Sequence, residues 1–273
     1  ANEQRWPPNR VRLRVQLARF YIDDSNLKEA TNLMTEAEGI LRSDVRNMTR
    51  RGDAIFWISR AEVEFYMAKS ILNMRSGQWQ DGIQNAKIAV EKSDELSKMM
   101  SMAPSENAKQ WSYGTMLYAY ATLGQQQILA GMYADAEWTM RDAYQRTRTY
   151  GFPETSMQGF YNRVADYYNA VGRFGDAYKF SEMSEKIVLD QGYQPGSPMW
   201  LWTRIRLNTA LIGSDRWQDA LKSFDLIDQE TARLGRAPRG VQNQSLLRGY
   251  VYLRNGQSDK ALKVLQANMN WHV

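Results

Sequence analysis

One short phrase recurs six times along this chain of 273 residues, and it limits the possible folds more than any other feature. In five copies, a turn that often holds glycine is followed by an aromatic or aliphatic residue, and a small residue stands three positions later; the sixth, weaker copy has Ser258 in place of the apolar residue. The small residues stand 52, 54, 41, 43 and 41 positions apart, at Ala30, Gly82, Ala136, Ala177, Ala220 and Ala261. Apolar residues flank each phrase at spacings of three and four, which is typical of amphipathic helices and not of strands. The pattern therefore predicts an all-α repeat.

Each copy of the phrase is expected to join two antiparallel helices, which we call helix A and helix B. The aromatic residue at the start of helix B, such as Trp79 or Trp217, would fill the space beside helix A. The small residue one turn later would let the two backbones approach closely, because a bulky side chain there would hold them apart. Glycine in the turn would supply a left-handed residue at low strain. The sequence thus predicts about six antiparallel helical hairpins.

The segment 159–189 carries the pattern most completely. Its helix A offers Tyr161, Val164, Ala165 and Tyr168, and a turn at Gly172 follows. This order resembles the tetratricopeptide (TPR) repeat, whose consensus runs W-x2-L-G-x2-Y. The resemblance covers nearly the whole chain, but the period exceeds the usual ~34 residues, which is similar to kinesin-light-chain-type repeats. It implies a right-handed α–α superhelix and, over residues 1–273, a single TPR-like solenoid domain.

Chain-breaking residues agree with this division into hairpins. A proline stands between each of several predicted B helices and the next A helix, at Pro104, Pro153, Pro198 and Pro238. Proline is tolerated near the first turn of a helix. The wide early spacings predict long helices over 27–48, 54–74 and 79–100. Trp200 and Trp202 lie two positions apart at one helix start, so only one of them is expected to point inward.

Composition excludes several classes of function. The chain has no cysteine and one histidine, so a thiolate metal site, a multi-histidine zinc site and a cysteine nucleophile are excluded, and a Ser-His-Asp triad is nearly so. No apolar run approaches the ~18 residues of a membrane span. We therefore expect no enzyme, no cofactor and no metal. A net charge of +5 is too mild to favour nucleic acid. The positive charge is concentrated between Glu230 and Asp259, at Arg233, Arg236, Arg239, Arg248 and Arg254.

The TPR resemblance implies a binding surface, because TPR proteins usually hold peptides in the concave groove lined by the A helices. Amides can bond a peptide backbone, tyrosines can flank its apolar side chains, and arginines can take carboxylates. The candidate groove residues are Arg12, Arg19, Tyr118, Gln125, Asn162, Asp166, Asn169, Thr209, Tyr250 and Arg254. Within this set, Asn162, Asp166 and Asn169 share one helical face. For each position the alternative is packing against a neighbouring helix.

The function predicted from these features is a non-enzymatic scaffold that binds a protein or peptide. A start without methionine and an end just after a helical pattern suggest a piece of a longer, bacterial-type polypeptide. Its long repeats resemble the arrays that accompany CHAT peptidase domains. The partner could therefore be another protein, the remainder of the same polypeptide, or a second copy in a homodimer.

Two other functions stay open at this stage. One is a small-molecule or signal-sensing array, which predicts a cavity between the long helices of the first hundred residues. The other is a periplasmic scaffold in envelope or polysaccharide assembly, with which the absence of cysteine is compatible. The compartment, cytoplasmic or periplasmic, is left undecided.

Overall fold

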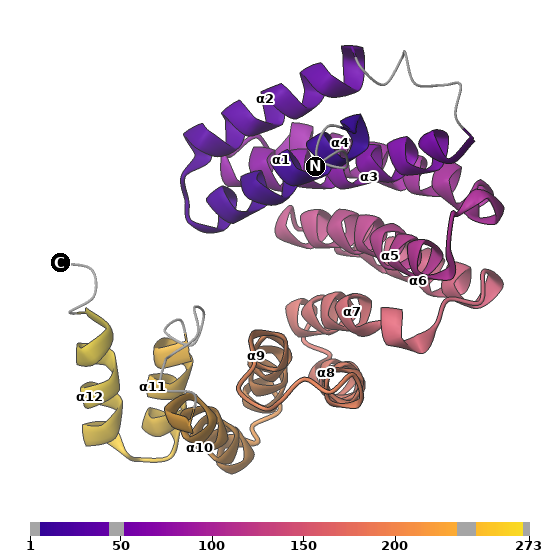
Figure 1. The fold of residues 1–273 in the computed structure, drawn as a ribbon. Helices are drawn as coiled ribbons and strands as arrows, with labels where there is room; N and C mark the ends of the chain where they lie inside the picture. The colour runs from indigo at the N-terminus through magenta and orange to yellow at the C-terminus, as the bar shows by residue number, and fades with distance from the viewer. Residues whose placement is uncertain (1–5, 44–51, 234–243, 270–273) are drawn as a thin grey trace. The chain divides into compact units, whose positions relative to one another are not determined.

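The computed structural model describes residues 6–43, 52–233 and 244–269. Over these residues the chain forms twelve α-helices, two short 3-10 helices and no strand (Figure 1). None of these helices is both long and apolar enough to cross a membrane. The A helices are α1 (Pro7–Asp23), α3 (Gly52–Arg75), α5 (Glu106–Leu129), α7 (Gln158–Ala170), α9 (Pro198–Gly213) and α11 (Gln244–Arg254). The B helices are α2 (Leu27–Ser43), α4 (Trp79–Lys98), α6 (Tyr133–Thr149), α8 (Phe174–Asp190), α10 (Trp217–Arg233) and α12 (Ser258–Met269). The predicted all-α repeat of six hairpins is confirmed.

The hairpin turns follow the repeat phrase closely. Every B helix begins at the residue that the phrase predicts. Each turn has three residues, and its central residue adopts a left-handed conformation, as Gly172 does with φ 75°. Four of the six turns have glycine there, while Ser25 and Asp215 occupy the same place with φ 61° and 57°. Glycine adopts this conformation without a steric penalty, which explains why it recurs in the phrase.

Helix boundaries differ from the predictions by small amounts. Helix α2 ends at Ser43, and the remainder of the predicted span 27–48 lies outside the described residues. Helix α3 extends the predicted span 54–74 slightly at both ends, and α4 ends at Lys98. Helix α9 begins at Pro198 after the cap Ser197, whose Oγ accepts the N–H of Trp200 at 3.4 Å. Pro238, Arg236 and Arg239 also lie outside the described residues.

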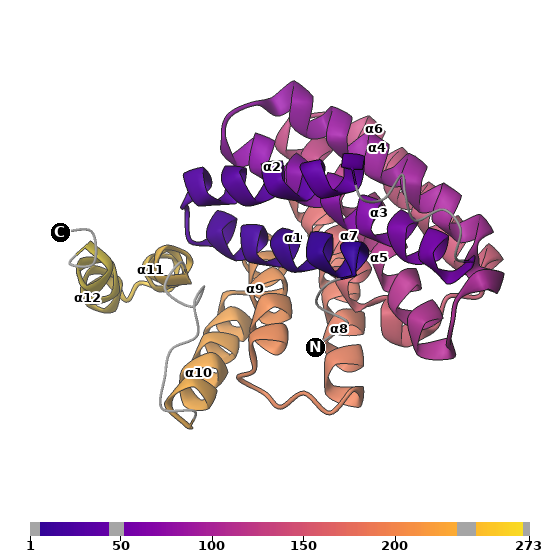
Figure 2. The same cartoon turned by 45° about the horizontal axis from the view of Figure 1, so that its top comes forward.

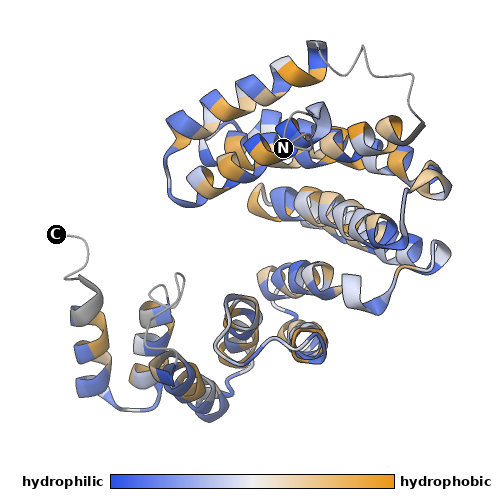
Figure 3. Ribbon diagram, viewed as in Figure 1, coloured by the Kyte–Doolittle hydropathy of each residue, from blue (hydrophilic) through white to orange (hydrophobic). Residues whose placement is uncertain are grey.

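The chain divides into two compact units, Ala1–Ser156 and Met157–Val273. In each unit, successive A helices lie next to one another, and a B helix that is followed by an A helix of the same unit packs against it (Figures 1 and 2). Apolar residues recur at about every turn along the helices (Figure 3). In the first unit they form cores around Phe65 and Phe56, and in the second unit a core around Trp200 and Phe224. That all 273 residues act as a single domain stays a prediction.

The small residues of the repeat phrase lie where helix B meets helix A. Ala30, Ala136, Ala177 and Ala220 are each 0% exposed. A Cβ added to Gly82 of α4 would lie 2.6 Å from the Met74 side chain and 3.3 Å from the Ser70 carbonyl oxygen, both on α3. The close approach of paired helices therefore depends on small side chains, as the sequence predicts.

Replacing Gly82 with leucine should destabilise the first unit by about 1–3 kcal/mol, because the added side chain must displace α3 from α4. Gly39 on the exposed face of α2 offers a matched control, since an added Cβ there meets nothing within 4 Å. Gly39→Leu should instead stabilise the helix by about 0.5–1 kcal/mol through its better helix propensity. Urea denaturation of both variants measures the difference, and equal stabilities would contradict the role assigned to Gly82.

Candidate functional site

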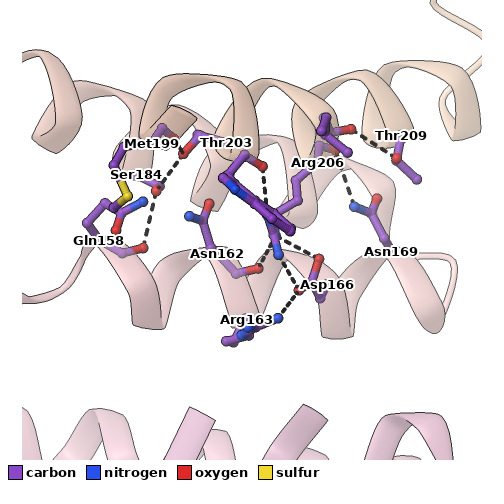
Figure 4. A network of polar contacts seen from close by, with 12 residues as sticks. Gln158, Asn162, Arg163, Asp166, Asn169, Ser184, Met199, Thr203, Arg206 and Thr209 are labelled. Carbon is purple, nitrogen blue, oxygen red and sulfur yellow. Dashed lines mark hydrogen bonds and ion pairs between the residues drawn. The ribbon is translucent and has the colours of Figure 1, made fainter. Parts of the chain in front are cut away.

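The predicted row Asn162, Asp166 and Asn169 lies on α7 and faces the next A helix, α9 (Figure 4). Spacings of four and three place the three side chains on one side of α7. Between the two helices lies Arg206, which the sequence analysis did not select. The polar contact region between these helices, which we call the α7–α9 seam, comprises Asn162, Arg163, Asp166, Asn169, Trp202 and Arg206.

Arg206 connects the two helices of the seam through several hydrogen bonds. Its Nε lies 2.8 Å from Asp166 Oδ1, and its Nη2 donates to Asp166 Oδ2 at 3.0 Å, so the ion pair is bidentate. Arg206 Nε also lies 3.1 Å from the carbonyl oxygen of Asn162, and Nη1 donates to the carbonyl of Trp202 at 2.6 Å. In return, Asn169 Nδ2 donates to the carbonyl of Arg206 at 3.3 Å. The row thus has a structural role as well as any binding role.

The open side of the seam is positively charged and aromatic. Asp166 Oδ2 also accepts from Nη1 of Arg163 at 3.3 Å, so one carboxylate serves two guanidinium groups. The indole of Trp202 is 54% exposed, and the guanidinium of Arg206 lies 5.7 Å from its ring centre. Trp200, two positions earlier, is 1% exposed, so one tryptophan points inward and the other outward, as their spacing predicts. An exposed aromatic ring beside excess positive charge suits a ligand with apolar and anionic parts.

Two hydrogen-bond acceptors in the seam are buried between α7 and α9. The Oδ1 atoms of Asn162 and Asn169 are buried, and neither receives a hydrogen bond within the described part of the chain. A buried acceptor left without a donor costs about 1–3 kcal/mol. Because both oxygens are fully buried, this cost falls on the packing of α7 against α9.

The other predicted residues of the second unit lie apart from this network. Thr209 is half-buried, and its Oγ1 donates to the carbonyl of Ile205 at 3.0 Å. Tyr250 and Arg254 of α11 both pack on Trp217 of α10, with the Tyr250 ring edge-on at 5.7 Å and the Arg254 guanidinium 5.3 Å from the indole. These residues therefore form a second cluster around Trp217.

In the first unit, the predicted Arg12 takes part in an ion pair between α1 and α3. Its Nε lies 3.1 Å from the carboxylate of Glu64, which also pairs with Arg60 at 3.1 Å. The guanidinium of Arg60 lies 5.7 Å from the ring of Trp57 and 5.9 Å from that of Trp111. Burial lowers the pKa of Arg60, and this effect is opposed by Glu64 and reinforced by Arg12. Arg12 therefore helps to join the first two A helices.

Two of the remaining predicted residues of the first unit lie in contact between α1 and α5. The guanidinium of Arg19 on α1 lies 5.6 Å from the ring centre of Tyr118 on α5. Gln125, one turn before the end of α5, is half-buried. Two residues that the sequence assigned to a groove thus contact each other directly.

A small cavity lies between α4, α5 and α6. Its volume of about 10 Å³ has room for about one water molecule. Asp94 Oδ1 beside it accepts from the hydroxyl of Tyr120 at 2.7 Å and from Nη1 of Arg146 at 2.8 Å. Burial and Asp94 raise the pKa of Tyr120, which keeps the phenol protonated as a donor. This cavity is too small to hold a metabolite.

The architecture matches known repeat proteins. No family model and no curated protein matches the sequence. Among crystal structures, the RapI apo form matches with a TM-score of 0.57 and 10% identity, over 95% of this chain and 96% of that chain. Two structures of Podosopora anserina repeats, described as kinesin light chain with nearly identical TPR-like repeats, match with TM-scores of 0.53 and 0.51. Both are 17% identical over 84% of this chain, and over 97% and 98% of theirs. The fold is a TPR-like helical repeat.

The residues that sequence reasoning missed in this TPR-like fold are Arg206 and Glu64. A signal for Arg206 was present, because Arg204 and Arg206 are the two charged residues in the stretch 199–212 of a predicted helix A. A charge on a mostly buried helix needs a partner. Arg204 finds one in Glu185 of α8, where burial raises the pKa of the carboxyl group and Arg204 partly opposes that effect. The partner of each arginine could not be named without the packing of the hairpins.

Proposed function

We propose that this TPR-like scaffold binds an extended peptide segment of a protein partner on the face of its A helices, with the α7–α9 seam as the principal contact. The observation that carries the proposal is the indole of Trp202, which is 54% exposed and lies beside the guanidinium of Arg206. An extended peptide presents side chains at regular intervals, and an apolar one can pack on such a ring.

The side chains of the seam fit such a ligand in complementary ways. Trp202 offers a large rigid surface to an apolar side chain at low entropic cost. Arg163 and Arg206 share one carboxylate, and Arg163 is the more exposed of the two, so its charge is available to an acidic side chain or a peptide carboxylate. No acid or base in the seam is held as a catalytic pair, because Asp166 is engaged by both arginines. Binding is therefore the chemistry that this arrangement supports.

Asn162→Ala separates binding from stability. Arg206 bonds the backbone carbonyl of residue 162, which alanine retains, so only the amide is lost. We expect the free energy of unfolding to stay unchanged or rise by up to about 1 kcal/mol, because a buried acceptor without a donor is removed. Peptide affinity should stay unchanged, because the buried amide offers no surface to a ligand. Urea denaturation and isothermal calorimetry measure the two effects.

The ligand for this measurement comes from selection of a random linear peptide library on the 273-residue chain. Selected peptides should bind Trp202→Ala at least tenfold more weakly than the parent, in keeping with an aromatic anchor. Trp138 on α6, 72% exposed, provides the control, and Trp138→Ala should bind like the parent. Failure to enrich any peptide, or equal affinity for the Trp202 and Trp138 variants, would remove the proposed site.

A further inference from the structure

Two A helices carry an exposed apolar stripe with spacings of four and three. On α1 the stripe is Leu13, Leu17 and Phe20, which are 46–55% exposed. On α11 it is Leu246, Tyr250 and Leu253, which are 47–63% exposed. Each stripe follows one helix face over two turns, which is the pattern of a surface that packs against another helix.

The positions of the α1 stripe can be compared with the same positions of the other A helices. Its residues stand twelve, eight and five positions before the left-handed turn residue Ser25. The same positions of α3, which precede Gly77, are Phe65, Lys69 and Leu72. Phe65 and Leu72 belong to the core shared with the first hairpin, and Lys69 pairs with Glu38 of α2 at 3.0 Å.

Later hairpins repeat this arrangement. At twelve positions before the turn residue, Thr203 of α9 lies 3.3 Å from Ser184 of α8, oxygen to oxygen. In the last hairpin, Arg248 of α11 stands eight positions before the turn residue Gly256, and its Nη1 donates to Asp228 of α10 at 2.6 Å. These positions therefore pack against the preceding hairpin, and the α1 stripe is the corresponding half of such a contact.

The α11 stripe is the opposite half. Its residues stand ten, six and three positions before Gly256. On α7 these positions are Asn162, Asp166 and Asn169, all of which contact Arg206 of the following A helix. On α1 they include Val15 and Ile22, which share a core with α3. These positions pack against the following hairpin, so α11 presents an apolar surface where a next A helix would lie.

We propose that the α11 stripe of one copy packs against the α1 stripe of a second copy, so that the chain associates head to tail. Both halves of the contact are present on the same chain, and each reproduces a face that the repeat already uses internally. Such a contact is heterologous, and it gives open chains or closed rings instead of a two-fold dimer. Near the stripes, Arg12 and Arg248 are paired with acids of their own chain. Arg19 near the α1 stripe and Arg254 near the α11 stripe both pack on aromatic rings, so their positive charges would repel each other across the contact. Association should therefore strengthen as salt screens that repulsion.

Two single substitutions and their mixture test the proposal by analytical ultracentrifugation over a wide concentration range. Leu17→Lys should remove the α1 half and Leu253→Lys the α11 half, so each variant should be monomeric where the parent associates. Their equimolar mixture should form a one-to-one dimer and nothing larger, because each variant retains one intact half. Leu129→Lys, at an exposed site on α5, is the control and should associate like the parent. All three sites are about half exposed, so thermal unfolding should be unchanged within the spread of surface substitutions, about 0.5 kcal/mol.

The remaining outcomes would overturn the proposal. A parent that stays monomeric at every concentration and salt level shows that the stripes do not meet. If only one of the two variants, Leu17→Lys or Leu253→Lys, loses the association, then the parent associates through two copies of the same stripe and not head to tail. A mixture of the two variants that stays monomeric also excludes a head-to-tail contact.

Discussion

Trp200→Ala should lower the free energy of unfolding by about 3–5 kcal/mol, the usual cost of removing a buried tryptophan. Trp200 is among the largest completely buried side chains, and it shares its core with Val188, Phe224 and Val251 from three other helices. The substitution would leave a cavity where α8, α9 and α10 meet, and α9 positions the binding seam. Loss of this core should therefore also weaken binding of selected peptides.

Trp202→Ala provides the matched control two positions along the same helix. Because its ring is half exposed and Arg206 bonds its backbone carbonyl, we expect a loss of at most about 1 kcal/mol. Denaturation in urea, followed by far-UV circular dichroism, compares the two variants. A large effect at Trp202 together with a small effect at Trp200 would contradict the inward and outward assignment of the two rings.

Arg206→Ala should cost about 2–4 kcal/mol, because it removes the bidentate pair with Asp166 and leaves buried groups of both helices without donors. Arg206→Lys keeps the charge but loses the planar fork, so its effect should be intermediate. The expected defect is local, since the lost bonds join α7 to α9. Hydrogen exchange should therefore rise most in those two helices.

Arg163→Ala is the control for this second substitution, because Arg163 pairs with the same carboxylate from within α7. Its ion pair spans three residues on one helix and is partly exposed, so we expect a loss of at most about 1 kcal/mol. Equal losses for the two arginines would show that Arg206 does not hold the helices together.

The fold could be predicted because its determinants are local. The turn phrase fixes the start of each B helix, and the small residues at positions such as Ala177 and Gly82 specify which side meets helix A. Both signals repeat along the chain, so an error in one copy is corrected by the others. The left-handed Ser25 and Asp215 were not recognisable as glycine equivalents, because their side chains favour other conformations.

The site was harder to predict because it depends on contacts between hairpins. Periodicity places Asn162, Asp166 and Asn169 on one face, but it does not show what that face meets. The structure shows Arg206 in contact with all three, across 37 to 44 residues of sequence. Similarly, the contact between Arg19 and Tyr118 joins the first and third A helices. Such pairings depend on the angle and register of packed helices, which a single sequence does not reveal.

The central claim, that the α7–α9 seam binds peptide, is tested most directly by the indole N–H signals of the nine tryptophans in a two-dimensional NMR spectrum. A selected peptide is titrated into the labelled 273-residue chain, with the signals assigned by single substitution. The account predicts that the signal of Trp202 shifts progressively to saturation while that of Trp138 stays in place. Saturable shifts at Trp138 with none at Trp202 would contradict it.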